Sequence, residues 1–302
     1  MSGRRAGAQA GIALLLVVWL LAVLAVLAGE FIFSTRVKAA AERNQRDGLA
    51  AYALALAGYR SALAQLAGEI RSVRADDDGR LLLTLRGDAE EVVAAGKDLA
   101  LGEGTFSWRV EAEDGRVNLN AVNAGSRATL TSLLGEVGLE PGVDRDTIAD
   151  SILDWVDDQK GHRLNGAEED FYRGLDPPYS CKDGPFDVPE ELLLVRGMKP
   201  RHFFGGEEGG KTYPGLRDLV TVCPTSLNLA VAPKAVLEAL GKARPAKAVA
   251  LAEESWFRVT ATGRAGEGGP ERTVVAVVRR SGAAGDRIEF GLVYWNDQQI
   301  PE

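Results

Sequence analysis

The sequence predicts an α+β fold in which one long N-terminal helix packs on an antiparallel sheet, and a large all-α insertion interrupts that sheet. Three observations predict this fold. An apolar or alanine-rich helical segment without proline runs from Ile12 to Val73. Segments with the period-two alternation of strands follow it, and three more such segments end the chain. A stretch with helical patterning separates the two groups of strands, and neither group has enough strands to stand alone.

The first half of the predicted helix is long enough to span a membrane. At a rise of about 1.5 Å per residue, the apolar segment from Ile12 to Phe33 covers roughly the 30 Å of a hydrocarbon core. Arg4 and Arg5 precede it, and positive charges at this position keep the short leader on the cytoplasmic side. The rest of the chain is therefore expected on the opposite side of the membrane.

Three kinds of N-terminal signal fit this segment. A secretory signal peptide would be cut after the apolar stretch, where Ala25 to Gly29 offers a loose site. A plain signal anchor would stay uncut. A prepilin-type leader would be cut before the apolar stretch, after Gly11. The third interpretation is favoured because a short arginine-bearing leader ends in glycine directly before Ile12, and because the helix continues beyond the membrane.

The second half of the helix carries a one-sided apolar stripe. Its members recur at alternating spacings of three and four: Leu49, Tyr52, Leu56, Tyr59, Leu63, Leu66, Ile70 and Val73. Such a stripe marks a helix face that packs on something. A sheet and a second copy of the helix in a coiled coil fit the stripe equally well.

The rest of the chain divides by its patterning. The predicted parts are a leader over 1–11, a transmembrane helix over 12–33, the remaining helix and first strands over 34–120, the all-α insertion over 121–250, and C-terminal strands over 251–302. The segment 87–103 is expected to be a loop, because it is rich in glycine and acidic residues. Within the insertion, a shared pattern at Arg116–Val122 and Ser226–Ala232 precedes a helix each time, which predicts two similar helical modules.

The densest group of potential oxygen ligands lies in the polar stretch after the second insertion helix. We expect calcium there, since Ca²⁺ takes six to eight oxygens in irregular geometry and a long loop is costly to order without support. The expected ligands are Asp157, Glu168 and Asp170, with Asp183 as a weaker candidate. A solvated acidic loop is the alternative.

Charge and motifs narrow the function class. The net charge of −8 argues against nucleic-acid binding, which needs clustered lysine and arginine. His162 and His202 lie in no hydrolase or metalloprotease motif, and no phosphate-binding glycine motif occurs, so we expect no enzyme. Cys181 and Cys223 match no zinc or redox spacing. They are either a disulfide, if this part is exported, or two free thiols.

Several segments together resemble a known family. In order, they are DGRVNLNAV, IADSILDWVDD, GAEEDFYRGLDPPY, PFDVPEELLLVRGM, LRDLVTV and SLNLAVAPKAVLEAL. With the Gly11–Ile12 junction, their order and spacing resemble the K-type minor pseudopilins of type II secretion systems, the general secretion pathway protein K family. The resemblance covers nearly the whole chain.

This resemblance implies both a structure and a function. It implies a pilin-like fold whose insertion modules look like SAM-like or helix-hairpin-helix units, and it also implies calcium in the acidic region. Prepilin peptidase would cut between Gly11 and Ile12 and methylate the new amino terminus. The protein would sit in the bacterial inner membrane with its body in the periplasm. With I- and J-type minor pseudopilins it would form the tip of the pseudopilus and contact secreted substrates. The alternative is a signal-anchored periplasmic scaffold or binding protein unrelated to pili.

Leu16 bears on the position within such an assembly. Most pilin-like subunits resemble one another in carrying glutamate as the fifth mature residue, whereas the fifth residue from Ile12 here is Leu16. A carboxylate within the membrane is costly unless a neighbouring amino terminus pairs with it. A subunit with nothing above it lacks that partner, so Leu16 suits a tip subunit. The alternative explanation of Leu16 is that this transmembrane helix is simply more apolar than that of other pilin-like subunits.

Overall fold

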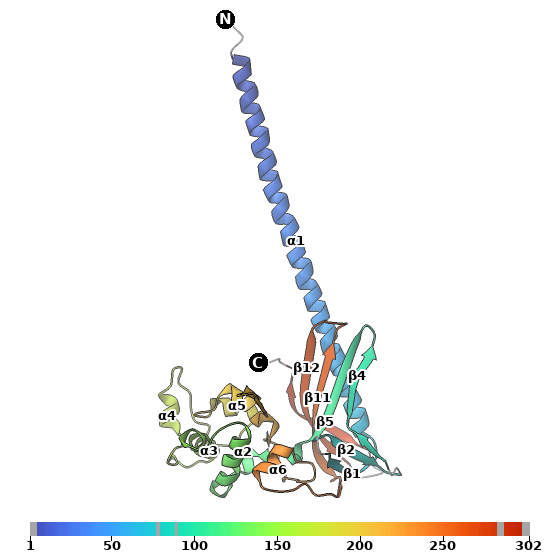
Figure 1. Cartoon of the computed structure of the whole chain (residues 1–302), viewed down its shortest axis with the longest axis vertical. Coiled ribbons are helices and arrows are strands. Elements are labelled where there is room, and N and C mark those ends of the chain that lie inside the picture. Colours follow the sequence, from blue (N-terminus) through green and yellow to red (C-terminus); the bar gives the residue numbers. More distant parts are fainter. Residues whose placement is uncertain (1–4, 77–78, 88–89, 283–286, 298–302) are drawn as a thin grey trace.

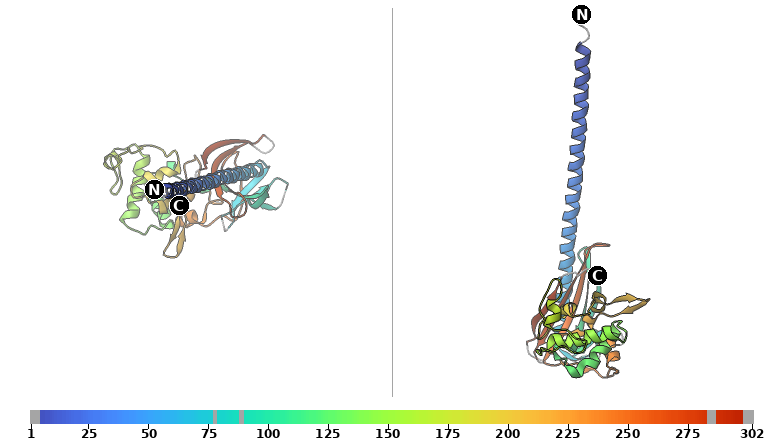
Figure 2. Two further views of the ribbon diagram at one scale, coloured as in Figure 1. Left: turned by 90° about the horizontal axis from the view of Figure 1, so that it is seen from above. Right: turned by 90° about the vertical axis from the view of Figure 1, so that its left-hand side faces the viewer.

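The computed structural model describes residues 5–76, 79–87, 90–282 and 287–297, with side chains from Leu15 onward. A single helix, α1 (Arg5–Leu66), projects from a compact body as a straight rod, and the described N-terminal end lies far from that body (Figures 1 and 2). By its length and apolar composition, α1 could cross a membrane. The Gly11–Ile12 junction lies within α1, outside the part whose side chains are described.

The body contains two antiparallel sheets. The first has the strand order β10-β1-β2-β3 and the second β13-β12-β11-β5-β4. Their strands are β1 (Ile70–Ala75), β2 (Leu81–Leu85), β3 (Glu91–Val93), β4 (Ala95–Leu101), β5 (Gly104–Ala112), β10 (Val249–Ala250), β11 (Glu254–Arg264), β12 (Glu271–Ser281) and β13 (Glu289–Asn296). The predicted fold class, a long helix followed by antiparallel sheets, is confirmed. The prediction of a loop over 87–103 is wrong, because β3 and β4 lie there as edge strands without apolar alternation.

The end of α1 packs on the five-stranded sheet, mainly on β11, β5 and β12 (Figure 1). Two details of the predicted stripe are wrong. The helix ends at Leu66, so Ile70 and Val73 belong to β1 instead. The buried face consists mostly of small residues that each come one position before a stripe residue, namely Gly48, Ala51, Ala55, Gly58 and Ala62, together with Leu54 and the stripe residue Leu66. The larger side chains lie at the flank, where Leu49 is 63% exposed and Tyr59 packs edge-on against Trp295 of β13.

Small residues let the helix and the sheet approach until their backbones touch. A Cβ atom added at Gly263 of β11 would lie 2.2 Å from the Ala51 carbonyl oxygen and 2.4 Å from the Ala55 nitrogen. At the next turn of α1, a Cβ at Gly58 would meet the Ser107 carbonyl oxygen at 3.1 Å. Helix position is therefore fixed by direct backbone contact rather than by interlocking of large side chains.

A buried arginine closes the C-terminal end of α1. Arg280 of β12, 4% exposed, donates from Nε to the Leu66 carbonyl at 2.9 Å and from Nη2 to the Gly68 carbonyl at 3.3 Å. The last carbonyls of a helix lack partners within the helix and carry partial negative charge, which favours a cation there. Arg280 thus sets where the helix stops on the sheet.

The insertion between β5 and β11 forms a second body beside the sheet with its own hydrophobic core (Figure 1). Its helices are η1 (Glu113–Gly115), η2 (Leu119–Ala121), η3 (Ala124–Ser126), α2 (Arg127–Glu136), α3 (Val143–Val156), α4 (Glu169–Arg173), η4 (Pro189–Leu194), α5 (Pro200–Phe204), η5 (Leu216–Asp218) and α6 (Lys234–Ala239). It is not purely helical. It also holds a parallel pair, β6 (Val117–Asn118) with β9 (Val220–Thr221), and a hairpin, β7 (Gly206–Glu208) with β8 (Lys211–Tyr213).

The repeated sequence pattern corresponds to a repeated turn. Asn118 Oδ1 accepts from the Asn120 backbone N–H at 2.9 Å, and Asn228 Oδ1 accepts from the Ala230 backbone N–H at 3.1 Å. This side-chain-to-backbone bond two residues ahead stabilises a turn without needing a glycine. The second turn rests on the start of the insertion, where the Asn228 N–H donates to the Asp114 carbonyl at 2.7 Å.

A buried group of charges joins the insertion to the sheet. Glu113, the first residue of η1 directly after β5, is 1% exposed and accepts from Arg258 of β11 at 2.8 and 3.0 Å and from Arg116 at 3.3 Å. Burial raises the pKa of Glu113, but the charges of the two arginines outweigh that effect and hold the pKa below its usual range.

The same two arginines also hold backbone carbonyls of the insertion. Arg116 donates to the Asp218 carbonyl at 3.0 Å, and Arg258 donates to the Arg217 carbonyl at 2.8 Å. The Glu113–Arg116–Arg258 cluster therefore connects the start of the insertion and its η5 segment to the sheet.

The first test concerns the helix–sheet contact. Gly263→Ala should lower the free energy of unfolding by about 1–3 kcal/mol, because backbone atoms of α1 must move to admit the methyl group. The measurement is thermal unfolding of the full chain in detergent. Gly161→Ala is the matched control, since its added Cβ meets nothing within 4 Å. Equal melting temperatures for the two variants would contradict the close approach.

The second test concerns the buried charges. Glu113→Gln should cost about 3–5 kcal/mol, because it leaves two buried guanidinium groups without a counter-charge. Denaturant unfolding measures this loss. Glu238→Gln, which removes an exposed pair with Lys234, should change stability by less than about 1 kcal/mol. A small effect at Glu113 would mean that the backbone carbonyls alone satisfy the arginines.

Candidate metal site

The acidic stretch begins on α3, where two aspartates lie on the buried side of the helix. Ile148, Ile152 and Trp155 anchor α3 in the insertion core, and Asp150 and Asp154 are buried beside them. Asp154 is fully buried, and a buried carboxylate needs hydrogen bonds or a counter-charge. The residues that follow α3 supply both.

Arg163 folds the loop after α3 back onto the helix. Its Nη1 donates to Asp154 Oδ1 at 2.5 Å and to Asp157 Oδ2 at 2.7 Å, and its backbone N–H donates to Asp154 Oδ2 at 3.1 Å. A second attachment lies nearby, where Asn165 donates to Asp150 at 3.2 Å. Part of this loop is therefore ordered by an arginine side chain rather than by a metal ion, and the Asp157 carboxylate is already paired with that arginine.

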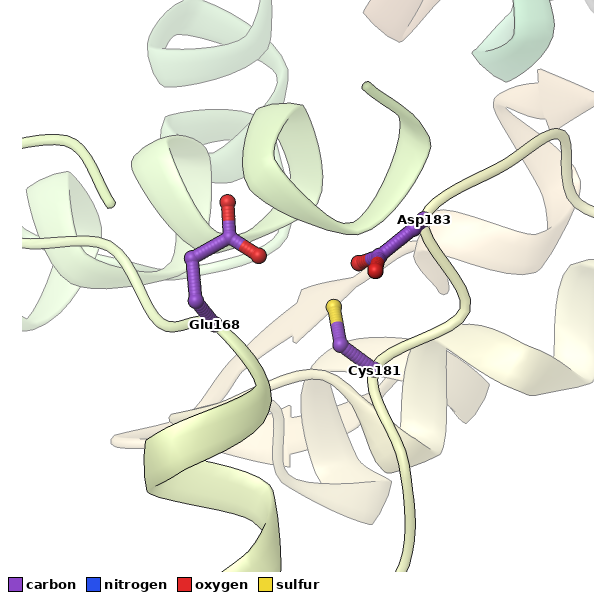
Figure 3. Close-up of side chains that lie close together, drawn as sticks. All are labelled: Glu168, Cys181 and Asp183. Atoms are coloured by element: carbon purple, nitrogen blue, oxygen red, sulfur yellow. The ribbon is translucent and has the colours of Figure 1, made fainter. Parts of the chain in front are cut away.

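Three side chains converge just beyond this loop: Glu168, Cys181 and Asp183 (Figure 3). Their nearest ligand atoms all lie within 4.8 Å of one another. Glu168 immediately precedes α4, while Cys181 and Asp183 come from the extended segment after it. Glu168 and Cys181 are each 6% exposed, whereas Asp183 is exposed and has a positive φ of 49°.

The electrostatics of Glu168 are unusual. Burial raises its pKa to about 7, and the charges of Asp154, Asp183 and Asp157 add to that rise. Within the described part of the chain, Glu168 Oε1 is buried and has no hydrogen-bond partner. A carboxylate oxygen in this state is stabilised by an added proton or by a cation.

The structure brings together two of the four predicted ligands. Glu168 and Asp183 lie in the converging group, while Asp157 is paired with Arg163 and Asp170 is exposed on α4 outside the group. Sequence reasoning missed Cys181 as a member. A signal was present, because side chains two residues apart in an extended segment point to the same side, as Cys181 and Asp183 do.

Of the two states expected for the cysteine pair, a disulfide and two free thiols, the structure shows the free thiols. Cys181 and Cys223 are both buried free cysteines. They lie in different surroundings, Cys181 beside Asp183 and Glu168, and Cys223 beside Thr221 and Glu113. Burial raises the pKa of Cys181 to about 12 and that of Cys223 to about 11, so both are protonated thiols at neutral pH.

These residues fit a divalent cation in part. Two carboxylates and an unsatisfied buried oxygen suit Ca²⁺, but a thiol is not a calcium ligand. Oxygens for the six to eight positions would have to come from both carboxylates, from backbone carbonyls and from water.

Comparisons with known proteins agree with this architecture. The family model for "Type II secretion system (T2SS), protein K" matches residues 115–204, which include the converging group. The putative type II secretion system protein K of Escherichia coli K12 is 29% identical over 63% of this chain and 58% of that protein. Type II secretion system protein K of Klebsiella pneumoniae is 27% identical over 63% of this chain and 58% of that protein. The matched region thus spans less than two thirds of either relative.

A solved structure shares the fold. It is that of the GspK–GspI–GspJ complex of the type 2 secretion system of enterotoxigenic Escherichia coli, whose GspK matches with a TM-score of 0.51 at 18% identity. The match covers 88% of this chain and 99% of that chain. The matching domain over residues 115–204, the two relatives and the shared fold all point to the same similarity, which is to type II secretion system protein K.

Proposed function

We propose that this protein is a structural minor pseudopilin at the tip of a type II secretion pseudopilus. The observation that carries the proposal is the division of α1 into two halves. The N-terminal half is apolar and exposed, and the C-terminal half packs on the five-stranded sheet. A helix built this way anchors the body to an inner membrane and can also pack among equivalent helices in a filament. Its role is assembly and protein secretion rather than catalysis.

The proposed partners are I- and J-type minor pseudopilins. The solved complex of the structural neighbour contains GspK, GspI and GspJ together, which supports a heterotrimeric tip for this chain as well. Prepilin peptidase and secreted substrates are the further proposed partners. The body would lie in the periplasm, with α1 crossing the inner membrane once.

The proposed maturation can be tested on the amino terminus. Mass spectrometry of protein from a host with prepilin peptidase should find a chain that begins at methylated Ile12. Gly11→Leu should block the cut, because the peptidase accepts a small residue before the apolar stretch, whereas Leu20→Ile should not. An intact Met1 would favour the signal-anchored scaffold, and a cut near Gly29 would indicate a secretory signal peptide; either result would contradict the proposed maturation.

The proposed tip position can be tested at Leu16. Co-expressed with I- and J-type partners, the wild-type chain should purify as a heterotrimer. Leu16→Glu should reduce membrane insertion and assembly, because an unpaired carboxylate within the apolar span is costly, at most about 2.5–3.5 kcal/mol, the value for the centre of a span. Leu16→Met is the control. Unchanged assembly of the glutamate variant would mean that a neighbour supplies a partner, and failure of the wild type to bind either partner would contradict the tip role.

We also propose that the insertion holds a divalent cation, with calcium as the ion that its carboxylates suit. Glu168 and Asp183 are the proposed ligands, supported by the unpaired oxygen of Glu168. Removal of the cation by EDTA should lower the melting temperature of the full chain, and calcium should restore it, because binding to the folded state alone stabilises it. Glu168→Gln should abolish the response, while Asp170→Asn should keep it. An unchanged melting curve on chelation would remove the cation from the proposal.

A further inference from the structure

A thiol occupies the place where an oxygen ligand would be expected. Cys181 lies between Glu168 and Asp183, with its sulfur turned toward both carboxylates (Figure 3). It is 6% exposed and belongs to no disulfide. The simplest explanation is that Cys181 only fills the hydrophobic core, where a free cysteine behaves as a small apolar residue. That explanation does not account for the buried, unpaired Glu168 Oε1 on the other side of the group.

The nearby cations are engaged elsewhere. Arg163 is paired with Asp154 and Asp157. Lys182, between Cys181 and Asp183 in sequence, donates instead to Asp187 at 2.7 Å and to Glu191 at 2.8 Å. Neither of these two side chains hydrogen-bonds to the carboxyl group of Glu168 or Asp183, so both carboxyl groups face the thiol at close range.

The donor set discriminates between metals. Calcium selects oxygen ligands, whereas Zn²⁺ is bound by thiolate, imidazole and carboxylate in a tetrahedron with bonds of about 2.3 Å to sulfur and about 2.0–2.2 Å to oxygen. Such bonds place sulfur and oxygen about 3.5 Å apart. The ligand atoms here lie within 4.8 Å of one another, so small side-chain movements, chiefly of the exposed Asp183, would close the site.

We propose that Glu168, Cys181 and Asp183 form a thiolate site that binds Zn²⁺ more tightly than Ca²⁺. As the bond from Sγ to the metal forms, the S–H bond breaks and the proton leaves to water. Glu168 and Asp183 each supply one carboxylate oxygen, and water takes the fourth position on the exposed side, next to Asp183. This inference rests on the cation site proposed above and specifies which ion that site prefers.

Cobalt reports on this site directly, because Co²⁺ replaces Zn²⁺ and its bond to a thiolate gives a charge-transfer band in the near ultraviolet. Metal-free full chain in detergent should develop the band and saturate at about one ion per chain. Zinc should then remove the band at equal concentration, whereas calcium should not do so even in large excess. A band that calcium removes as readily as zinc overturns the proposed preference.

The two buried cysteines provide a matched pair of variants. Cys181→Ser should lose the band and weaken zinc binding by more than about tenfold, since even outer-shell changes cost about 10–100-fold. Cys223→Ser should keep the cobalt band and the wild-type affinity for zinc. A band that survives Cys181→Ser overturns the assignment. Zinc-edge X-ray absorption on the wild type needs no variant and should find one sulfur neighbour at about 2.3 Å.

The outcomes separate this inference from the calcium proposal. A melting temperature that responds to calcium and EDTA, together with absence of the cobalt band, overturns the thiolate site and leaves the calcium site standing. No response to any metal overturns both. The tip role depends on partner binding and is unaffected by either result.

Discussion

Glu113 is a buried carboxylate shared by two buried arginines, and the arrangement of the two halves of the body depends on it. The chain leaves the sheet at Glu113 and returns to it at β11, where Arg258 reaches back to the same carboxylate. Arg116 and Arg258 also donate hydrogen bonds to backbone carbonyls of η5 in the insertion. Because removal of one charge would strand the others, the insertion has a single favoured seat on the sheet.

Apolar packing within each half of the body does not fix how the two halves are placed relative to each other. The hydrophobic cluster of the insertion and that of the helix and sheet are separate. Hydrophobic contact is non-directional, so it would tolerate several orientations of the insertion. Fixed hydrogen-bond directions from two guanidinium groups select one. The same division of labour recurs at the end of α1, where apolar packing brings the helix to the sheet and Arg280 determines where it stops.

The sequence predicted the elements better than the contacts between them. Periodicity identified the long helix, the strands on both sides of the insertion and most of its helices, because these follow from local patterns. It misplaced the buried face of α1, since the rule that large apolar residues are buried fails where Gly58 and Ala62 allow backbone contact. The loop prediction over 87–103 failed because edge strands such as β4 need no apolar alternation. At the candidate metal site, the acidic composition pointed to Glu168 and Asp183. The sequence pattern did not reveal that Arg163 would form an ion pair with Asp157.

The close seating of α1 has a mechanical consequence. Where the Gly263 backbone lies against the Ala51 and Ala55 backbone, no long flexible side chain separates the helix from the sheet. The helix cannot slide or roll on the sheet without first lifting away from it. An axial displacement of the exposed half of α1 would therefore be passed to the sheet through this backbone contact.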